Sequence, residues 1–361
     1  MRWMILSLIN VLLMQSAAFA QDKLQQIGPS LAHPWGMTML TKDEVLVTTR
    51  PGRLLRINLI NGADAEIKNL PAVVHSGQGG LLDVAAVGDQ IFLCYAKKIG
   101  RGAATAIDRA ILDGDQLINR VTIFHSNNNP QSSHHFGCRL TIKGQMIYAS
   151  LGDRGNRYNA QKPANHDGSV VRIGFDGTPP ANNPNLPGWE DALFTIGHRN
   201  PQGMAINPAT GDIWAHEHGP QGGDEINILK KGENYGWPVI SFGAEYGTGT
   251  PVSEATSHPD IADPIWVWTP SIAPSGMAFY PSDAAMFEEL QGSLLVGSLK
   301  FSRLYHVMLN SDGLPTKERV LIDGTLGRIR DVAIAPDGAI LLLNDAGKSG
   351  NPAGGLYRLS R

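Results

Sequence analysis

The sequence is poor in several features that define common protein classes. Charged residues make up 17% of its 361 residues, and a net charge of −3 leaves no basic face for nucleic acid. Helical spacing is weak and is confined to residues 283–290. We therefore expect neither a nucleic-acid-binding protein nor a helical one.

Cysteine is also scarce, with Cys94 and Cys138 as the two residues of this type. One pair in a chain of this length is not a disulfide scaffold, and it argues against a thiolate zinc site. Both residues lie in apolar, strand-like runs, which favours buried free thiols. An oxidising compartment would permit a bridge instead.

Long apolar runs are absent except for a short one near the start of the chain. Arg2 precedes apolar residues 3–14, and residues 18–20 (Ala-Phe-Ala) form a cleavage pattern. This arrangement predicts a signal peptide over residues 1–20 and a periplasmic or secreted mature chain, residues 21–361. A spanning helix needs about 20 apolar residues, so a retained membrane anchor is the weaker alternative and we expect no stable membrane insertion.

Glycine and proline are abundant, with 41 and 23 residues, which is typical of short strands joined by turns. A turn with Gly, Asp or Lys, followed by a β-rich run, recurs six times. The copies cover residues 42–47, 88–93, 144–149, 211–215, 291–296 and 338–343. Such repeats are typical of propeller blades. They predict an all-β chain in which residues 21–361 form a single six-bladed β-propeller of four-stranded antiparallel blades, with a β-sandwich as the alternative.

A propeller must close its ring. Residues 23–27 and residues 355–359 both have strand-like composition. We expect the two ends of the mature chain to share one blade.

Residues 196–238 combine glycines with charged and polar residues that a buried core strand does not need. Arg199-Asn200 offers a forked cation beside an amide. Oxygen ligands for calcium could come from three groups of residues: His216 to Pro220, Asp224-Glu225, and Glu233 to Tyr235. The His-Glu-His-Gly spacing resembles a zinc site, but a third ligand is not obvious. The stretch is interpreted as the wall of a site.

Adjacent His134 and His135 offer a general base. Neighbouring side chains on a strand point to opposite sides, so the two should not serve one site. For residues 75–83, which contain Gln78, a simple turn and a site loop both stay open. Residues 153–156 (Asp-Arg-Gly-Asn) are interpreted as a polar turn, with a substrate-facing loop as the alternative.

Arg328 and Arg330 alternate and should lie on one strand face, where they repel unless an anion lies between them. A solvated edge strand is the alternative. Together with Arg199 and Lys300 they come from different blades and could converge on the propeller axis. Four cations there would suit a ligand with several carboxylates.

These motifs together resemble the soluble quinoprotein aldose sugar dehydrogenases of the glucose/sorbosone dehydrogenase family. The matching pieces are HxGxRL, GxRNPQG, HGPxGGDEIN, NYGWP and RxRDV, in the family's order. The resemblance implies a six-bladed propeller that binds pyrroloquinoline quinone (PQQ) and calcium. It also implies oxidation of an aldose at C1 to a lactone, with hydride passing to PQQ and electrons to an external acceptor.

The resemblance also assigns residues. His135 matches the base that removes the C1 hydroxyl proton, and it is preferred over His134 because it holds the first place of HxGxRL. The matches to PQQ contacts are Gln78, Arg199, Asn200, Tyr246, Lys300, Arg328 and Arg330. Gly219 and Pro220 match backbone carbonyls on the PQQ-bound calcium, and Glu225 and Tyr235 match a second calcium site.

The sequence departs from the family pattern in two places near these residues. Cys138 stands where many relatives have Gly, and His218 stands where the glucose-specific branch has Gln. The chain is also shorter than that branch, which favours an open site for several aldoses and a monomer over a dimer. Two other functions stay open: a calcium-dependent propeller lactonase or other hydrolase, and a non-catalytic sugar-binding propeller.

Overall fold

The computed structural model describes residues 22–345 and 354–361, and its regular structure is almost entirely β. Two short 3₁₀ helices are present, η1 (Arg157–Gln161) and η2 (Glu288–Leu290). The predicted signal peptide lies outside the described residues. Within those residues, no helix combines the length and the apolar content needed to cross a membrane.

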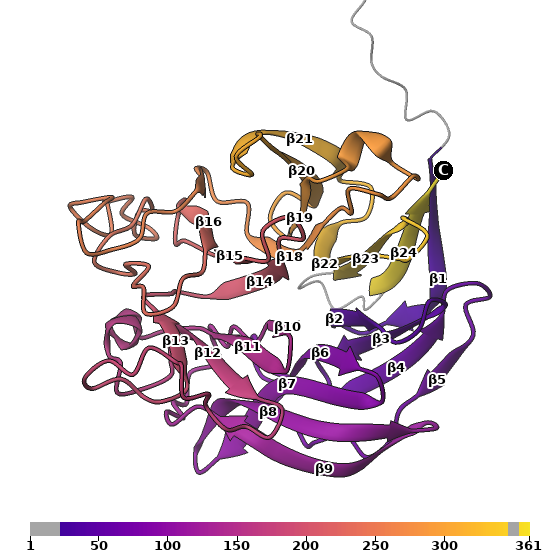
Figure 1. The fold of residues 1–361 in the computed structure, drawn as a ribbon, viewed down its shortest axis with the longest axis horizontal. Helices are drawn as coiled ribbons and strands as arrows, with labels where there is room; N and C mark the ends of the chain where they lie inside the picture. Colours follow the sequence, from indigo (N-terminus) through magenta and orange to yellow (C-terminus); the bar gives the residue numbers. More distant parts are fainter. Residues whose placement is uncertain (1–21, 346–353) are drawn as a thin grey trace, which may run out of the picture.

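The strands form six four-stranded antiparallel sheets that surround a central axis as the blades of a propeller (Figure 1). The first three blades contain β2 (Pro34–Met39), β3 (Glu44–Thr49), β4 (Arg53–Asn58) and β5 (Asp64–Glu66); β6 (Leu81–Val87), β7 (Gln90–Ile99), β8 (Gly102–Asp113) and β9 (Gln116–His125); and β10 (Leu140–Lys143), β11 (Met146–Leu151), β12 (Ser169–Gly174) and β13 (Leu193–Ile196). The next two contain β14 (Pro201–Ile206), β15 (Ile213–Glu217), β16 (Asp224–Ile228) and β17 (Trp266–Trp268); and β18 (Pro274–Phe279), β19 (Leu294–Ser298), β20 (Arg303–Leu309) and β21 (Pro315–Asp323). The sixth contains β22 (Arg328–Ile334), β23 (Ile340–Asp345), β24 (Gly354–Ser360) and β1 (Lys23–Leu31). The predicted fold class is confirmed.

The six repeats found in the sequence have one structural meaning. Each covers the turn before the second strand of a blade and the beginning of that strand, from β3 through β7, β11, β15 and β19 to β23. The apolar residues of these strands are buried, because both faces of a blade pack against neighbouring blades. The wide repeat spacings correspond to long connections, such as residues 229–265 between β16 and β17.

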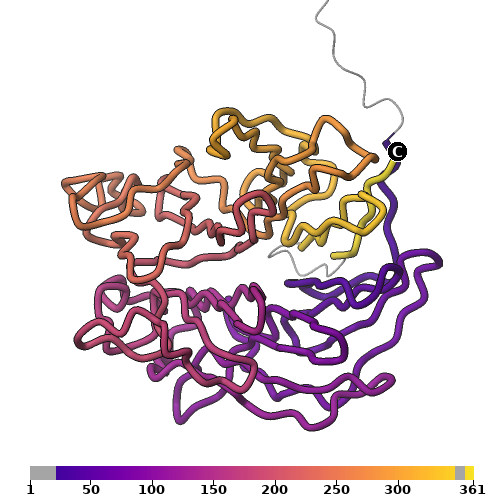
Figure 2. Tube along the Cα trace, in the orientation of Figure 1, coloured from indigo at the N-terminus to yellow at the C-terminus, as the bar shows by residue number. Residues whose placement is uncertain are grey.

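The ring closes as expected. β1 pairs antiparallel with β24, with Lys23 opposite Ser360 and Ile27 opposite Leu356. The indigo and yellow ends of the chain therefore lie side by side in the trace (Figure 2). The first strand thus completes the last blade as its outermost strand.

The hydrophobic core lies between blades and leaves the axis to polar residues. The buried apolar clusters join neighbouring blades, as when Trp214 and Ile226 of the fourth blade pack with Leu294 and Val296 of the fifth. Five of the six innermost strands contain a register irregularity near their start. Such bulges redirect side chains at the rims of sheets and next to active sites. The strand ends that face the axis are therefore shaped for a site.

Arg139 closes the axis between the inner strands. Its Nη1 atom lies 3.1 Å from both Asp83 Oδ1 and Asp331 Oδ1, and its Nε–H donates to the Gln202 carbonyl at 2.9 Å. The guanidinium also contacts the Trp35 ring at 4.5 Å. This buried ion network joins strands from four different blades.

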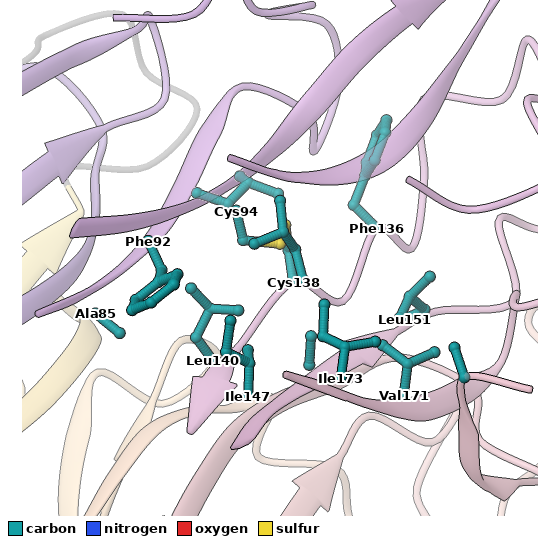
Figure 3. Close-up of a cluster of buried hydrophobic side chains, with 14 of the residues drawn as sticks. Ala85, Phe92, Cys94, Phe136, Cys138, Leu140, Ile147, Leu151, Val171 and Ile173 are labelled. Carbon is teal, nitrogen blue, oxygen red and sulfur yellow. A yellow bond between two sulfur atoms is a disulfide. The ribbon is translucent and has the colours of Figure 1, made fainter. Parts of the chain in front are cut away.

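The expectation of free thiols is wrong, because Cys94 and Cys138 form a disulfide with a Cα–Cα distance of 5.7 Å (Figure 3). Cys94 lies on β7, and Cys138 lies in the loop before β10. Both are fully buried among apolar side chains such as Phe92 and Ile147. The bond ties the second blade to the loop that carries His134 and His135.

Candidate active site

One large cavity opens on the propeller axis. It has a volume of about 840 Å³, and all six blades or the loops that enter them contribute to its wall. Seven of the residues predicted for the site line it: Gln78, Asn200, Pro220, Tyr246, Lys300, Arg328 and Arg330. Arg199, Gly219, Glu225 and Tyr235 line a second, smaller cavity. These residues, which are distant in sequence, are therefore brought together around two cavities, whereas His135 lines neither of them.

The positively charged side chains of the large cavity have few hydrogen-bond partners within the protein. Lys300 is exposed, and its Nζ lies 5.2 Å from the centre of the Phe301 ring. Arg328 donates to the Leu299 carbonyl at 3.2 Å, and Arg330 donates to Gln202 Oε1 at 3.3 Å. The Nε–H groups of both arginines are buried and have no hydrogen-bond partner among the described residues. Arg50, which the sequence reasoning missed, also lines the cavity.

Arg330 is placed by a bulge and not by simple alternation. The register between β22 and β23 shifts between Ile329 and Asp331, so Arg330 has no opposite partner in the ladder. Burial lowers the pKa of Arg330 to about 9, the nearby Asp345 opposes this, and the Arg328 and Arg50 guanidiniums add to the lowering. A cluster of cations with unused donors fits an anionic ligand and is unfavourable without one. These residues therefore fit a ligand that carries several carboxylates, such as PQQ.

The two adjacent histidines lie in a loop, so the strand geometry assumed from the sequence does not apply. His135 has a φ of 51°, and its ring centroid lies 6.3 Å from that of His134. His134 lines the large cavity, whereas the side chain of His135 is only 15% exposed. The Gln78 side chain accepts a hydrogen bond from the His135 backbone N–H at 2.7 Å. Gln78 therefore supports the loop as well as lining the cavity.

His135 is paired with a buried carboxylate. Its Nδ1 lies 2.6 Å from Asp153 Oδ1, which fixes the tautomer with the proton on Nδ1 and leaves Nε2 as the acceptor. Burial lowers the pKa of His135, and the hydrogen bond to Asp153 opposes that shift. Burial alone would raise the pKa of Asp153, but hydrogen bonds from His135, Gly155 and Trp237 bring it below its ordinary value. The pair can accept a proton at Nε2 near neutral pH.

The interpretation of residues 153–156 as a simple polar turn is incomplete. Asp153 is 1% exposed, and Arg154 is buried with a φ of 57°. The Arg154 guanidinium donates to the carbonyls of Ser132 and His134 and lies 3.4 Å from the Phe136 ring centroid. Residues 153–156 therefore hold the loop that carries His134 and His135 in place through the contacts of Arg154. One signal in the sequence could have indicated this role: a pair of charged residues followed by glycine, shortly after a buried strand.

The carbonyls of Gly219 and Pro220 are accessible to donors. Gly219 O accepts from Arg199 Nη1 at 3.0 Å, and Pro220 O accepts from the Tyr246 hydroxyl at 2.8 Å. A Cβ atom at Gly219 would lie 2.2 Å from the Gly222 carbonyl, so glycine is required by the close approach of the chain. Carbonyl oxygens are calcium ligands, and these two fit that role.

The smaller cavity has a volume of about 20 Å³, which is room for one ion. Glu225 and Glu217 both line it, and burial together with the charge of Glu217 raises the pKa of Glu225 well above its ordinary value. A cation would relieve this repulsion, so the donor set fits calcium. The Tyr235 hydroxyl already bonds the backbone of Ile228 and Lys230, which leaves the Tyr235 carbonyl for an ion. Glu217 lies in the segment expected to offer oxygen ligands, residues 216–220, but the sequence did not single it out as a ligand.

Of the three histidines in residues 196–238, His198 and His218 form side-chain hydrogen bonds within the protein, and His218 also lines the large cavity. His198 is fully buried between Glu217 Oε1, at 2.7 Å, and Thr195 Oγ1, at 2.9 Å. His218 donates from Nε2 to the Pro274 carbonyl at 2.6 Å, and burial lowers its pKa well below the ordinary value. No cluster of three or more His, Cys, Asp or Glu side chains suited to a metal occurs in residues 22–345 and 354–361.

Comparisons with known proteins agree with this architecture. The chain is 40% identical over 342 residues to the uncharacterized protein slr1608 of Synechocystis, covering 87% of this chain and 82% of the relative. It is 36% identical to the aldose sugar dehydrogenase YliI of Escherichia coli K12, covering 91% of each. The PQQ-bound form of an aldose sugar dehydrogenase from Streptomyces coelicolor superimposes with a TM-score of 0.76 at 26% identity, covering 94% of this chain and 98% of that one. The family model described as glucose/sorbosone dehydrogenase matches residues 31–358, and the chain therefore belongs to the glucose/sorbosone dehydrogenase family.

Proposed function

We propose that this protein oxidises aldose sugars at C1 to the lactone, using PQQ and calcium, and passes the electrons to an external acceptor. The observation that carries the proposal is the axial cavity. It gathers Lys300, Arg328 and Arg330 from two blades around a space of about 840 Å³. The loop that carries His135 contributes His134 to its wall, and His135 is paired with Asp153. The family and the aldose sugar dehydrogenases among its relatives support this substrate class.

The protein would hold the cofactor by its charges. Arg328 and Arg330 offer guanidinium donors to carboxylates, and Lys300 adds a third positive charge from the neighbouring blade. Gly219 and Pro220 would hold the adjacent calcium through their carbonyls, while Gln78, Asn200 and Tyr246 complete the wall. Glu225, Glu217 and the Tyr235 carbonyl would hold the second calcium. When bound with calcium, PQQ supplies the acceptor for hydride from sugar C1.

His135 would act as the general base. Its Nε2 takes the proton of the sugar C1 hydroxyl, because Nδ1 is committed to Asp153. The positive charge that forms on the ring is stabilised by the Asp153 carboxylate. Arg199, whose guanidinium donates to the Gly219 carbonyl at 3.0 Å, would add a further positive charge near the cofactor.

A calcium-dependent hydrolase is less well supported. Such a site needs side-chain carboxylates around an axial ion. Asp345 is the one carboxylate among the described residues that line the large cavity, and it contacts His33 at 3.1 Å and Arg330 at 3.8 Å. A non-catalytic sugar-binding role leaves the cation cluster without a purpose.

The test is reconstitution. Apo-protein is supplied with calcium and PQQ, and the reduction of a dye is followed with a panel of aldoses. Turnover that depends on PQQ is expected with several of them, and no PQQ-dependent turnover on any aldose would overturn the proposal. His135→Ala should abolish turnover and leave PQQ binding largely intact. Loss of PQQ binding in that variant would instead make His135 a cofactor ligand.

Export to a periplasm or the medium remains part of the proposal, together with a monomeric state and an unidentified electron acceptor. The Cys94–Cys138 disulfide supports an oxidising compartment. Chromatography with light scattering and fractionation of cells that express the full chain test both points.

A further inference from the structure

We propose that Trp237 is a positioning residue for this reaction: its indole N–H fixes the carboxylate of Asp153 and, through it, the ring of His135. The inference rests on the proposed function, since it concerns the base of that reaction. Trp237 belongs to the NYGWP segment, which the resemblance connects to an ion through Tyr235 alone.

The two oxygens of Asp153 are held by different donors. Oδ1 accepts from His135 Nδ1 at 2.6 Å and from the Gly155 N–H at 2.7 Å. Oδ2 accepts from Trp237 Nε1 at 2.9 Å, in a fully buried contact. An aspartate carboxylate rotates over a broad range about its last torsion. With the indole bonded to Oδ2, that rotation stops and Oδ1 faces the histidine.

The backbone cannot do this alone. The Asp153 N–H donates to the Arg199 carbonyl at 2.8 Å, which sets the position of the main chain but not the plane of the carboxylate. The Gly155 N–H binds Oδ1, the same oxygen that faces His135, whereas Oδ2 is held by the Trp237 indole. Trp237 is the donor that distinguishes the two oxygens.

The indole itself is firmly placed. The Trp237 backbone N–H donates to the Gly197 carbonyl at 2.9 Å, and Gln161 Nε2 donates to the Trp237 carbonyl at 2.8 Å. The guanidiniums of Arg199 and Arg157 lie 5.3 Å and 5.5 Å from the ring centroid. Trp237 belongs to the connection that follows β16, whereas His135 lies before β10. The hydrogen bond therefore carries the geometry of the fourth blade to the base of the third.

Loss of the indole N–H should shift the pH at which the His135–Asp153 pair binds a proton in one direction. The charged or titratable groups that act on His135 are Asp153, Arg199 and His134, and Arg154 and Asp167 also act near Asp153. Without its donor, the Asp153 carboxylate is less stabilised as an anion, so the His135–Asp153 pair binds a proton at higher pH. A general base works only when it is unprotonated. The acid limb of the kcat/KM profile therefore moves to higher pH.

Two changes at position 237 test the inference in the intact chain. Trp237→Phe removes the N–H, and β-(3-benzothienyl)alanine introduced at the same position removes it while keeping the shape of the indole. Trp266→Phe is the matched control, because the Trp266 Nε1–H is buried without a hydrogen-bond partner in the described part of the chain. We expect kcat to fall about ten-fold or more at position 237, with PQQ affinity and KM nearly unchanged.

A second readout does not need turnover. Proton and nitrogen NMR of histidine-labelled protein reports the titration of His135 and the Nδ1–H resonance in the bond to Asp153. The inference predicts a shift of both in the benzothienyl protein and none in Trp266→Phe. If the wild type fails to oxidise aldoses but these shifts occur, the proposed function falls and the positioning role stands. An unchanged His135 titration and an unchanged acid limb in a folded benzothienyl protein would overturn the inference.

Discussion

His135 and Asp153 are 18 positions apart in the sequence, and His135 Nδ1 lies 2.6 Å from Asp153 Oδ1. Asp153 belongs to the turn that also holds the loop carrying His135. Replacing Asp153 by Asn preserves the shape but removes the negative charge and replaces one acceptor oxygen by an NH2 donor. We expect kcat to fall by a factor on the order of 10² to 10³, because the tautomer and the stabilisation of the protonated ring are both lost. Steady-state kinetics at saturating PQQ measures this. A variant as active as the wild type would remove Asp153 from the mechanism.

The pH profile should reflect the buried position of His135. Burial lowers its pKa from the ordinary 6.5. Because the base is active when neutral, kcat/KM should stay high as the pH falls to 6.5 and should decline only below it. Circular dichroism over the same range separates loss of the fold from titration. An acid limb centred above pH 6.5 contradicts the assignment.

The cation cluster should bind PQQ by charge. Arg330→Gln removes one guanidinium with an unused buried donor, and we expect about a 10- to 100-fold weaker affinity for PQQ. Fluorescence quenching or calorimetry with PQQ measures it. Arg303→Gln is the control, since Arg303 forms a solvent-accessible ion pair with Asp323, with 2.8 Å between Nε and Oδ1. Equal losses in both variants would point to a general charge effect.

Calcium should stabilise the fold through the small cavity. In the absence of PQQ, added calcium should raise the Tm of the wild type by mass action. Glu225→Gln should lose most of this gain, because it removes the carboxylate whose pKa is raised by burial and by Glu217. Glu254→Gln, an exposed residue of the loop after β16, serves as the comparison. Identical calcium responses in all three proteins would place the stabilising ion elsewhere.

The disulfide should stabilise the protein because it closes a loop of 44 positions and so reduces the conformational entropy of the unfolded chain. Chain-entropy arguments give about 2–4 kcal/mol for its removal, measured by urea unfolding of the Cys94→Ala/Cys138→Ala variant. Cys138 has a φ of 77°, a conformation that favours glycine. The Cys94→Ala/Cys138→Gly variant should therefore recover about 1 kcal/mol. A larger loss with glycine than with alanine would show that packing, not backbone conformation, decides the site.

The strand pattern could be read from the sequence because it depends on local chemistry. Gly-rich turns followed by apolar runs identified the second strand of every blade, and the terminal strands paired as expected. Arg328 and Arg330 were also correctly expected to lie together, although a bulge places Arg330. Local composition contains such information because turns and buried strands need particular residues.

What the sequence concealed depends on tertiary contacts. Cys94 and Cys138 looked like core thiols, because nothing local shows that a loop brings Cys138 onto β7. Asp153 looked like part of a turn, and its partner His135 lies on another segment. Glu217 looked like part of a zinc-like motif, and the carboxylate that it acts on, Glu225, also lies on another segment. His134 and His135 do not alternate as they would on a strand, because they lie in a loop that holds His135 at positive φ.

The pairing of β1 with β24 has a consequence for how activity arises. The last blade is complete only when strands from the two ends of the described chain have met, and the axial cavity takes part of its wall from that blade. Contacts between such distant positions form late and slowly. Until that pairing forms, the sixth blade that completes the wall of the axial cavity is unfinished, so a partly folded chain has only separated parts of the proposed site.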